Sequence, residues 1–365
     1  MTTDRNFMGR NGFVWFSGVV EDRLDPQYLG RVRVRCVGFH TDNKQDLPTA
    51  DLPWAMVVHP VTSSGISGLG QSPSFMVEGT WVFGYFRDGE ECQEPVVLGT
   101  MPGRPVELAG TSGFYDPSQT YPRYRDEVDT NRLAVNLKND AGEEINPHLS
   151  LVLRRASRIT GIPTADIDTF TAADGTLIPG SDGDTWSQPL IPYNATYPFN
   201  HVMETESGHI VEYDDTAGNE RIHQRHKSGT SYEISPDGTQ TNLITGDHYT
   251  ITNADNKIDI AGDSDITIGG RHKIYINKDG QPNNHYDIQI GPNANINIQV
   301  ATGNINVRTI QGNVNVESGG DYNLRVGGNM TTVVEGNVLT TVEGSNTENT
   351  TGAKTIRGAT IDLNP

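Results

Sequence analysis

The sequence predicts an all-β protein with a small N-terminal barrel, an irregular linker and insertion, and a C-terminal trimeric intertwined β-helix. Two observations carry this prediction. Short runs of alternating apolar and polar residues fill the first hundred positions, which is the pattern of half-buried strands. Near the C-terminus, glycine recurs every eight residues, which indicates a repeat architecture. These glycines are Gly312, Gly320, Gly328, Gly336, Gly344 and Gly352.

Each eight-residue repeat, or octad, is predicted to form a short strand and a corner. Glycine tolerates positive φ, and an Asn or Asp often follows it, as at Asn313 and Asp321, so the pair suits a turn. Alternate positions after each corner are mostly apolar or Thr and are expected to point one way, into a core. The predicted core residues are Val314, Val316, Leu324, Val326, Met330, Val334, Val338 and Val342.

One short strand per octad cannot enclose a core by itself, so neighbouring strands must cover it. Single-chain β-helices normally use longer coils. We therefore expect several chains to wind about one axis, as a homotrimer.

Composition agrees with an extended protein that has a thin core. Of 365 residues, 34% are hydrophobic and 40 are glycine. The formal net charge of −19 argues against a nucleic-acid partner. Cys36 and Cys92 could pair, but we expect free thiols, and no metal-ligand spacing is present. Neither a standard export signal nor a membrane anchor is expected.

Residues 1–110 are predicted to form the barrel, with strands near 13–20, 31–38, 54–59, 79–86 and 96–99. In the second run, Arg31, Arg33 and Arg35 alternate with two valines, so the valines should face the core and the arginines solvent or a partner. No aromatic platform is interleaved with them. We therefore interpret the three arginines as a protein-docking surface and not a nucleic-acid site.

Residues 111–200 are predicted to be a linker and insertion with one short helix. Apolar residues from Leu149 to Ile159 fall on one helical face, after Pro147 and before Gly161. We expect this helix to pack on the barrel or on a neighbouring chain, with binding of an acidic partner as the alternative. The acidic residues of this region are interpreted as solvated loop and not as a glycosidase pair.

Residues 201–365 are predicted to be hairpins leading into the triple-stranded needle, with strands near 209–213, 221–226 and 231–234. His223 and His226 should point to opposite faces of one strand and so should not chelate a metal together. The chain ends near two apolar residues, Ile361 and Leu363, which predict a blunt apolar end that needs a cap.

The N-terminal motifs resemble the central spike proteins of T4-like contractile-tailed phages. The likeness is specific over roughly the first hundred residues, and the hairpins and octads resemble the needle of that family. The resemblance rests on Trp15-Phe16-Ser17-Gly18-Val19-Val20-Glu21-Asp22-Arg23, Asp25-Pro26, Leu29-Gly30-Arg31-Val32-Arg33-Val34-Arg35, Leu52-Pro53-Trp54 and Val77-Glu78-Gly79-Thr80.

This resemblance implies an oligonucleotide/oligosaccharide-binding (OB) fold for the barrel, docking on a baseplate hub trimer, and a tip capped by a PAAR-type protein. It implies a virion component in the tail baseplate that penetrates the host outer membrane when the sheath contracts. The T4 member carries a lysozyme domain between barrel and needle. The interval between Arg123 and His201 is too short for one, so we expect no enzyme, no cofactor and no metal.

Three alternatives stay open. An ion held on the trimer axis by His272 or His285 is a minor one. The protein could instead be the spike of a related injection or type VI-like secretion system, or a receptor-binding or polysaccharide-degrading tailspike. Octads this short leave no groove for the last of these functions.

Overall fold

The computed structural model describes residues 12–104, 113–121, 128–135, 193–277, 280, 282 and 285–362. In these residues the regular structure is almost entirely β. The exceptions are α1 (Arg132–Val135) and two short 3-10 turns, η1 (Thr49–Asp51) and η2 (Gly89–Glu91). The predicted all-β fold class is confirmed.

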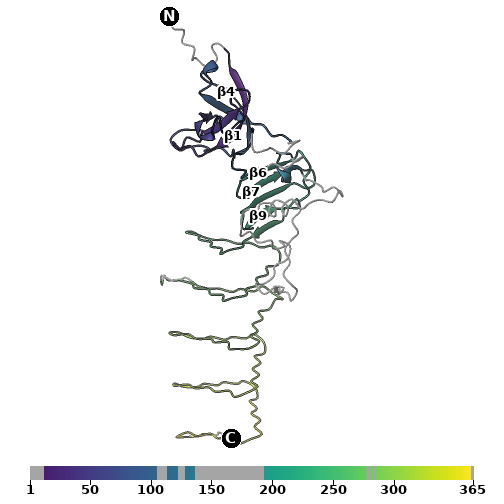
Figure 1. Ribbon diagram of the computed structural model, residues 1–365. Coiled ribbons are helices and arrows are strands. Elements are labelled where there is room, and N and C mark those ends of the chain that lie inside the picture. Colours follow the sequence, from purple (N-terminus) through teal and green to yellow (C-terminus); the bar gives the residue numbers. More distant parts are fainter. Residues whose placement is uncertain are drawn as a thin grey trace. The chain divides into compact units, whose positions relative to one another are not determined.

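The N-terminal strands close into a five-stranded barrel in the order β1-β2-β3-β5-β4 (Figure 1). Only β3 and β5 run parallel, and the other neighbours are antiparallel. All five strands overlap the ranges that the sequence predicts. They are β1 (Val14–Asp22), β2 (Val32–Cys36), β3 (Trp54–Val57), β4 (Trp81–Phe86) and β5 (Pro95–Thr100).

The barrel core is built from one side of each alternating strand. Phe16, Val34 and Val82 are buried in it, together with Cys36, and Cys92 packs against it. Both cysteines are free, as the sequence predicts. Burial in this apolar core raises the pKa of the Cys36 thiol to about 12, so it stays protonated and serves as a small hydrophobic residue.

Five further strands form an antiparallel sheet in the order β10-β9-β8-β7-β6, which we call the hairpin sheet (Figure 1). Gly208, Gly218, Gly229 and Gly238 have positive φ in its turns. The predicted hairpin strands correspond to β7, β8 and β9, whereas β6 and β10 were not predicted. The strands are β6 (Asn200–Glu204), β7 (Ile210–Asp214), β8 (Arg221–Arg225), β9 (Ser231–Ile234) and β10 (Gln240–Leu243).

Side-chain contacts join the barrel to the hairpin sheet within one compact unit, Met1–His272. Arg23 at the end of β1 forms an ion pair with Glu206 (2.6 Å) in the turn after β6. The hydroxyl of Tyr121 donates to the same carboxylate. The predicted domain boundaries at residues 110 and 200 stay predictions.

Little of the region 111–200 lies among the described residues. Helix α1 packs on β6, and its Leu133 is fully buried. The predicted helix near 149–159 lies outside the described residues, as do the acidic residues around it.

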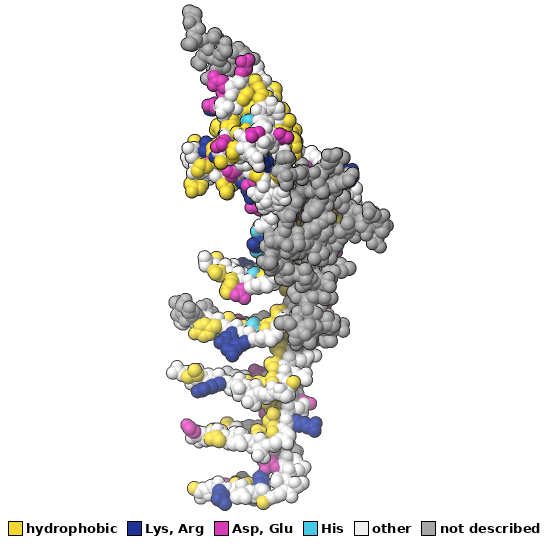
Figure 2. All heavy atoms as spheres, in the orientation of Figure 1, with side chains coloured by type: hydrophobic (Ala, Val, Ile, Leu, Met, Phe, Trp, Pro, Cys, Tyr) yellow, Lys and Arg dark blue, Asp and Glu magenta, His cyan; other side chains and the backbone are white. Residues whose placement is uncertain are grey.

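The second unit, Lys273–Pro365, contains no strand among its described residues, and Figure 1 draws it without arrows. Its octads are six-residue segments that belong to no strand or helix, separated by bends. Figure 2 shows hydrophobic side chains along these segments. An isolated chain therefore leaves the predicted core uncovered.

Candidate functional site

Arg31 forms an ion pair with Asp25, which lies in the loop just before it in the sequence. The carboxylate of Asp25 accepts from the backbone N–H groups of Gln27 (3.0 Å), Leu29 (2.9 Å) and Arg31 (3.2 Å). The Arg31 guanidinium donates to both oxygens of that carboxylate, at 3.1 and 2.7 Å. The hydrogen bond from Arg31 holds the pKa of Asp25 far below its ordinary range, and the backbone donors lower it further. The segment from Asp25 to Arg31 is therefore a loop that the Asp25 carboxylate holds in place through hydrogen bonds.

Arg33 fastens the connection between β2 and β3. Its Nη1 donates to the backbone carbonyls of Thr49 (3.1 Å) and Leu52 (2.9 Å), and also to that of Ala50. Its guanidinium lies 4.5 Å from the ring centroid of Trp54. These contacts explain why Leu-Pro-Trp accompanies the arginine strand in the sequence. The side chains of Arg31 and Arg33 keep only 19% and 17% exposure, and docking through them stays a prediction.

Arg35 is buried, so the expectation that it faces solvent or a partner is wrong. Its Nε and Nη2 donate to the Glu21 carboxylate at 2.7 and 3.1 Å, and both side chains are fully buried. Its Nη1 and Nη2 also donate to the backbone carbonyls of Thr41 and Leu47. Alternation could not reveal this because the loops between β2 and β3, which cover that side of the strand, lie beyond the strand itself.

An uncharged aromatic surface covers the outside of β1 and β4. The rings of Trp15 and Phe83 are stacked with centroids 5.3 Å apart, and Tyr85 meets Trp15 edge-on at 5.7 Å. Phe13 completes this aromatic ladder, 5.1 Å from Tyr85. Phe13, Trp15 and Phe83 are 42%, 47% and 39% exposed. The sequence analysis did not predict this surface. The signal was available, because β4 has apolar residues at both its odd and its even positions, which indicates that both of its faces are apolar.

The hairpin sheet buries a charged network. Glu212 on β7 receives Arg221 Nη2 on one oxygen at 2.7 Å and contacts His223 Nδ1 through the other at 2.8 Å. Arg221 Nη1 reaches Glu233 at 3.2 Å, and the Asn200 amide donates to Glu212 at 3.0 Å. These contacts tie β6, β7, β8 and β9 together on the buried side of the sheet, so the network is suited to a structural role.

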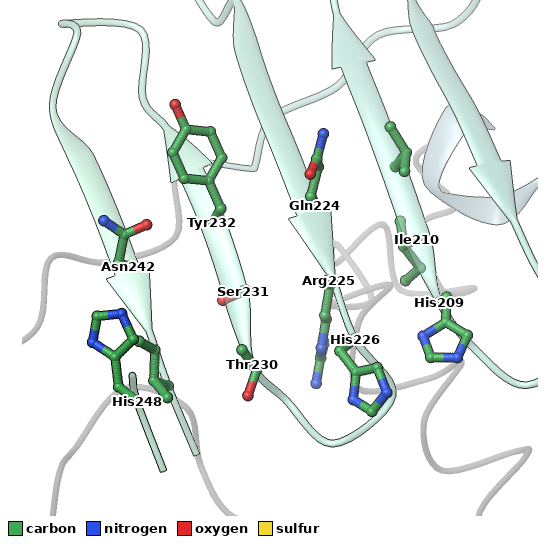
Figure 3. Close-up of a pocket in the computed structure, with 12 residues that line it drawn as sticks. His209, Ile210, Gln224, Arg225, His226, Thr230, Ser231, Tyr232, Asn242 and His248 are labelled. Carbon is green, nitrogen blue, oxygen red and sulfur yellow. The ribbon is translucent and has the colours of Figure 1, made fainter. Parts of the chain in front are cut away.

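An open hollow of about 560 Å³ lies where β7 and β9 begin and β8 and β10 end (Figure 3). The rings of His209 and His226 meet there, with centroids 4.5 Å apart. His226 is exposed while His223 on the same strand segment is buried, in agreement with their predicted opposite orientation. No group of three or more His, Cys, Asp or Glu in the described residues is arranged to hold a metal ion. His272 and His285 are exposed.

The six octad glycines all lie at bends of the chain. Only Gly312 has φ in the left-handed region, at 116°, so the conformational reason for glycine applies there. At Gly320, Gly328, Gly336 and Gly344, an added Cβ would meet nothing within 4 Å in this chain. Neither backbone strain nor contacts within one chain therefore require glycine at these corners.

The eight predicted core residues of the octads are 46–72% exposed in one chain. Val333 and Leu339, which alternation assigns to the opposite side, are more exposed, at 84% and 89%. At the C-terminus, Ile361 is 50% exposed, and Leu363 lies outside the described residues. The part of the chain that the structure describes holds no helix with the length and apolarity that a membrane crossing requires.

Comparison with known proteins gives one family and two curated relatives. The family model for the Gp5 N-terminal OB domain matches residues 38–169. Protein Gp5 of Vibrio phage KVP40 is 39% identical over 292 residues, which cover 74% of this chain and 66% of the phage protein. The pre-baseplate central spike protein Gp5 of Enterobacteria phage T4 is 26% identical over an aligned length of 471 positions, and the alignment spans 74% of this chain and 81% of the phage protein. The chain thus spans just under two thirds of the Vibrio phage relative.

Proposed function

Because the chain belongs to the Gp5 N-terminal OB domain family, we propose that it is the structural central spike of a contractile phage-tail baseplate. In this role it resides in the virion and penetrates the host outer membrane transiently when the sheath contracts. The similarity to a protein named as a pre-baseplate central spike supports this location. The single observation that supports the proposed role in membrane penetration is the octad array.

The octads form a homotrimeric, triple-stranded β-helix needle in this proposal. Eight apolar core residues per chain are about half exposed or more, which a soluble protein does not keep in contact with water. Three chains wound about one axis would bury them together. The open space around the octad glycines has the same explanation, because a closely approaching backbone from another chain would exclude a Cβ.

Interlocked strands would give the needle its resistance to force. Each segment would share backbone hydrogen bonds with segments of the neighbouring chains, so opening one requires contacts on several sides to break. Such an assembly unfolds slowly and tolerates compression. The net charge of −19 per chain would keep these needles from pairing laterally.

The barrel would dock the spike on a separate baseplate hub trimer. The sequence-based candidates for this contact are Arg31 and Arg33, both of which already have partners within the barrel. The aromatic ladder on β1 and β4 is a second candidate, because exposed Trp, Tyr and Phe are enriched in the centres of protein interfaces.

The apolar C-terminal end would receive a small PAAR-type tip protein. Ile361 is half exposed one residue from the end of the described chain, where a trimer would present three copies. Leu363 follows it in sequence. A cap over these residues would close the open end of the β-structure.

We infer that the chain has no lysozyme domain. The support is the short interval between Arg123 and His201, since a walled cleft for two carboxylates needs more chain. A spike of a related injection system would share the same needle. A polysaccharide-degrading tailspike is disfavoured because the octads provide no groove.

Light scattering on the full chain, with a peptidoglycan-hydrolysis assay on the same sample, tests this function. We expect a mass of three times 39.8 kDa and no hydrolysis. A monomer at micromolar concentration would contradict the needle. Robust hydrolysis would instead reveal an enzyme in the middle of the chain.

A further inference from the structure

Three buried polar atoms of the hairpin sheet have no hydrogen-bond partner within the described part of the chain. They are Asn200 Oδ1, Asp214 Oδ2 and Arg221 Nε, out of five such atoms in the described residues. Each of the three residues is at most 3% exposed. Buried polar groups nearly always have a partner, so three unpartnered atoms in one sheet indicate a bound group.

The strand register makes these three residues neighbours. Asp214 on β7 pairs with Asn200 on β6 and with Arg221 on β8, so they form one row across the buried face of the sheet. We call them the polar row. The Asn200 amide and the Arg221 guanidinium both donate to the same oxygen of Glu212, at 3.0 and 2.7 Å. This shared acceptor draws the two outer members of the polar row toward its centre.

The orientation of the Asn200 amide is fixed by its existing hydrogen bonds. Its Nδ2 donates to the backbone carbonyl of Leu133 and to Glu212, both at 3.0 Å. Turning the amide over would set Oδ1 against two acceptors, which excludes the flipped orientation. Asn200 therefore presents an acceptor to the polar row.

The other two side chains are fixed in the same way. Asp214 Oδ1 accepts the backbone N–H of Thr216 at 3.0 Å, so Oδ2 is the oxygen that needs a donor. The two Nη atoms of Arg221 hold Glu212 and Glu233, which leaves Nε–H as its unused donor. The polar row therefore offers one donor and two acceptors.

We propose that the polar row binds one internal water molecule. The water accepts a hydrogen bond from Arg221 Nε and donates its two hydrogens to Asn200 Oδ1 and Asp214 Oδ2. One donor and two acceptors are the complement of a single water, and buried waters typically make about three hydrogen bonds to such groups.

A cation is a poorer occupant of the same position. It could bind the two oxygens, but it would face the Nε–H of Arg221, whose guanidinium already carries a positive charge. The described residues also hold no group of three or more His, Cys, Asp or Glu arranged for a metal ion. Water satisfies all three atoms without adding charge.

The polar row lies where the linker docks on the sheet. The carbonyl of Leu133 in α1 accepts the Tyr193 hydroxyl at 2.6 Å as well as the Asn200 amide. The ring of Tyr193 lies 5.2 Å from the Arg221 guanidinium. The water thus joins three strands beneath the linker segments and is a structural part of the sheet, independent of the number of chains in the assembly.

A crystal structure of the full chain, at a resolution that shows ordered waters, tests the proposal. We expect one density peak within about 2.7–3.2 Å of Arg221 Nε, Asn200 Oδ1 and Asp214 Oδ2. A direct bond between Arg221 Nε and Asp214 Oδ2, without such a peak, would overturn it. So would a peak about 2.3–2.6 Å from the two oxygens alone, because those distances indicate a cation.

Unfolding rates at a fixed temperature give a second test. Asn200→Ala and Asp214→Ala should each speed unfolding. Because one water serves both side chains, the rate increase of the double variant should fall short of the product of the single increases by about threefold or more. Asn200→Ala with Asn194→Ala, an exposed amide, is the control pair and should give the full product. A full product for Asn200 and Asp214 would contradict the shared water, and the crystal structure decides if a variant fails to fold.

Discussion

Each arginine of β2 is fixed by acceptors within the barrel. Arg31 clasps a loop through Asp25, Arg33 holds the carbonyls around η1, and Arg35 pairs with Glu21 in the interior. A buried guanidinium suits this last position because it satisfies one carboxylate and two carbonyls at once. At the residue scale the arginine strand is a stabilising device.

Replacing Arg35 with Ala should destabilise the barrel by about 3–5 kcal/mol, because Glu21 would remain buried without its main partner. Denaturant unfolding followed by tryptophan fluorescence measures the change. Arg87→Ala is the matched control, since the Arg87–Glu94 pair is about half exposed and should matter little. Equal effects of the two substitutions would contradict the structural role of Arg35.

At the scale of elements, alternation decides which side chains share a face but not which face is buried. The barrel strands bury their apolar side around Phe16 and Val34. The hairpin sheet does the reverse, because Glu212, Arg221 and Glu233 satisfy one another across its strands. In the octads neither face is covered within one chain. Whether a face is buried therefore depends on what packs against it, and not on the alternation of residues along the strand.

We expect Val326→Asp to prevent trimer assembly, because three carboxylates would then lie near the axis without partners. Asn323→Asp, in the same octad but on the opposite side, introduces the same charge and should leave assembly intact. Gel mobility in SDS without heating measures this difference. SDS-resistant trimers of Val326→Asp would refute the inward register.

At the scale of the whole molecule, the proposed spike depends on its two ends. The barrel end offers an exposed aromatic ladder, and the needle end offers the exposed side chain of Ile361. Both surfaces are costly to leave in water, so each is expected to be covered in the assembled baseplate. In the proposed spike, the octad array would supply length and stiffness.

Ending the chain after Gly358 should leave the trimer intact and abolish binding of the tip protein. The removed residues include Ile361 and Leu363 but none of the eight predicted core residues. A pull-down with the purified tip protein, alongside light scattering of the truncated chain, reads out both effects. Binding that persists would place the tip contact elsewhere, whereas loss of the trimer would show that the end stabilises the needle.

The sequence by itself determined the strands of the barrel, the central hairpins and the octad corners, because these follow from local alternation, turn residues and spacing. Only the tertiary structure decided that Arg35 is buried, that Phe13 and Trp15 join Phe83 and Tyr85 in one ladder, and that the hairpin sheet turns its charges inward. The physical reason is that burial depends on what packs against a face. For these residues the packing groups come from loops and strands distant in sequence, which no local pattern specifies.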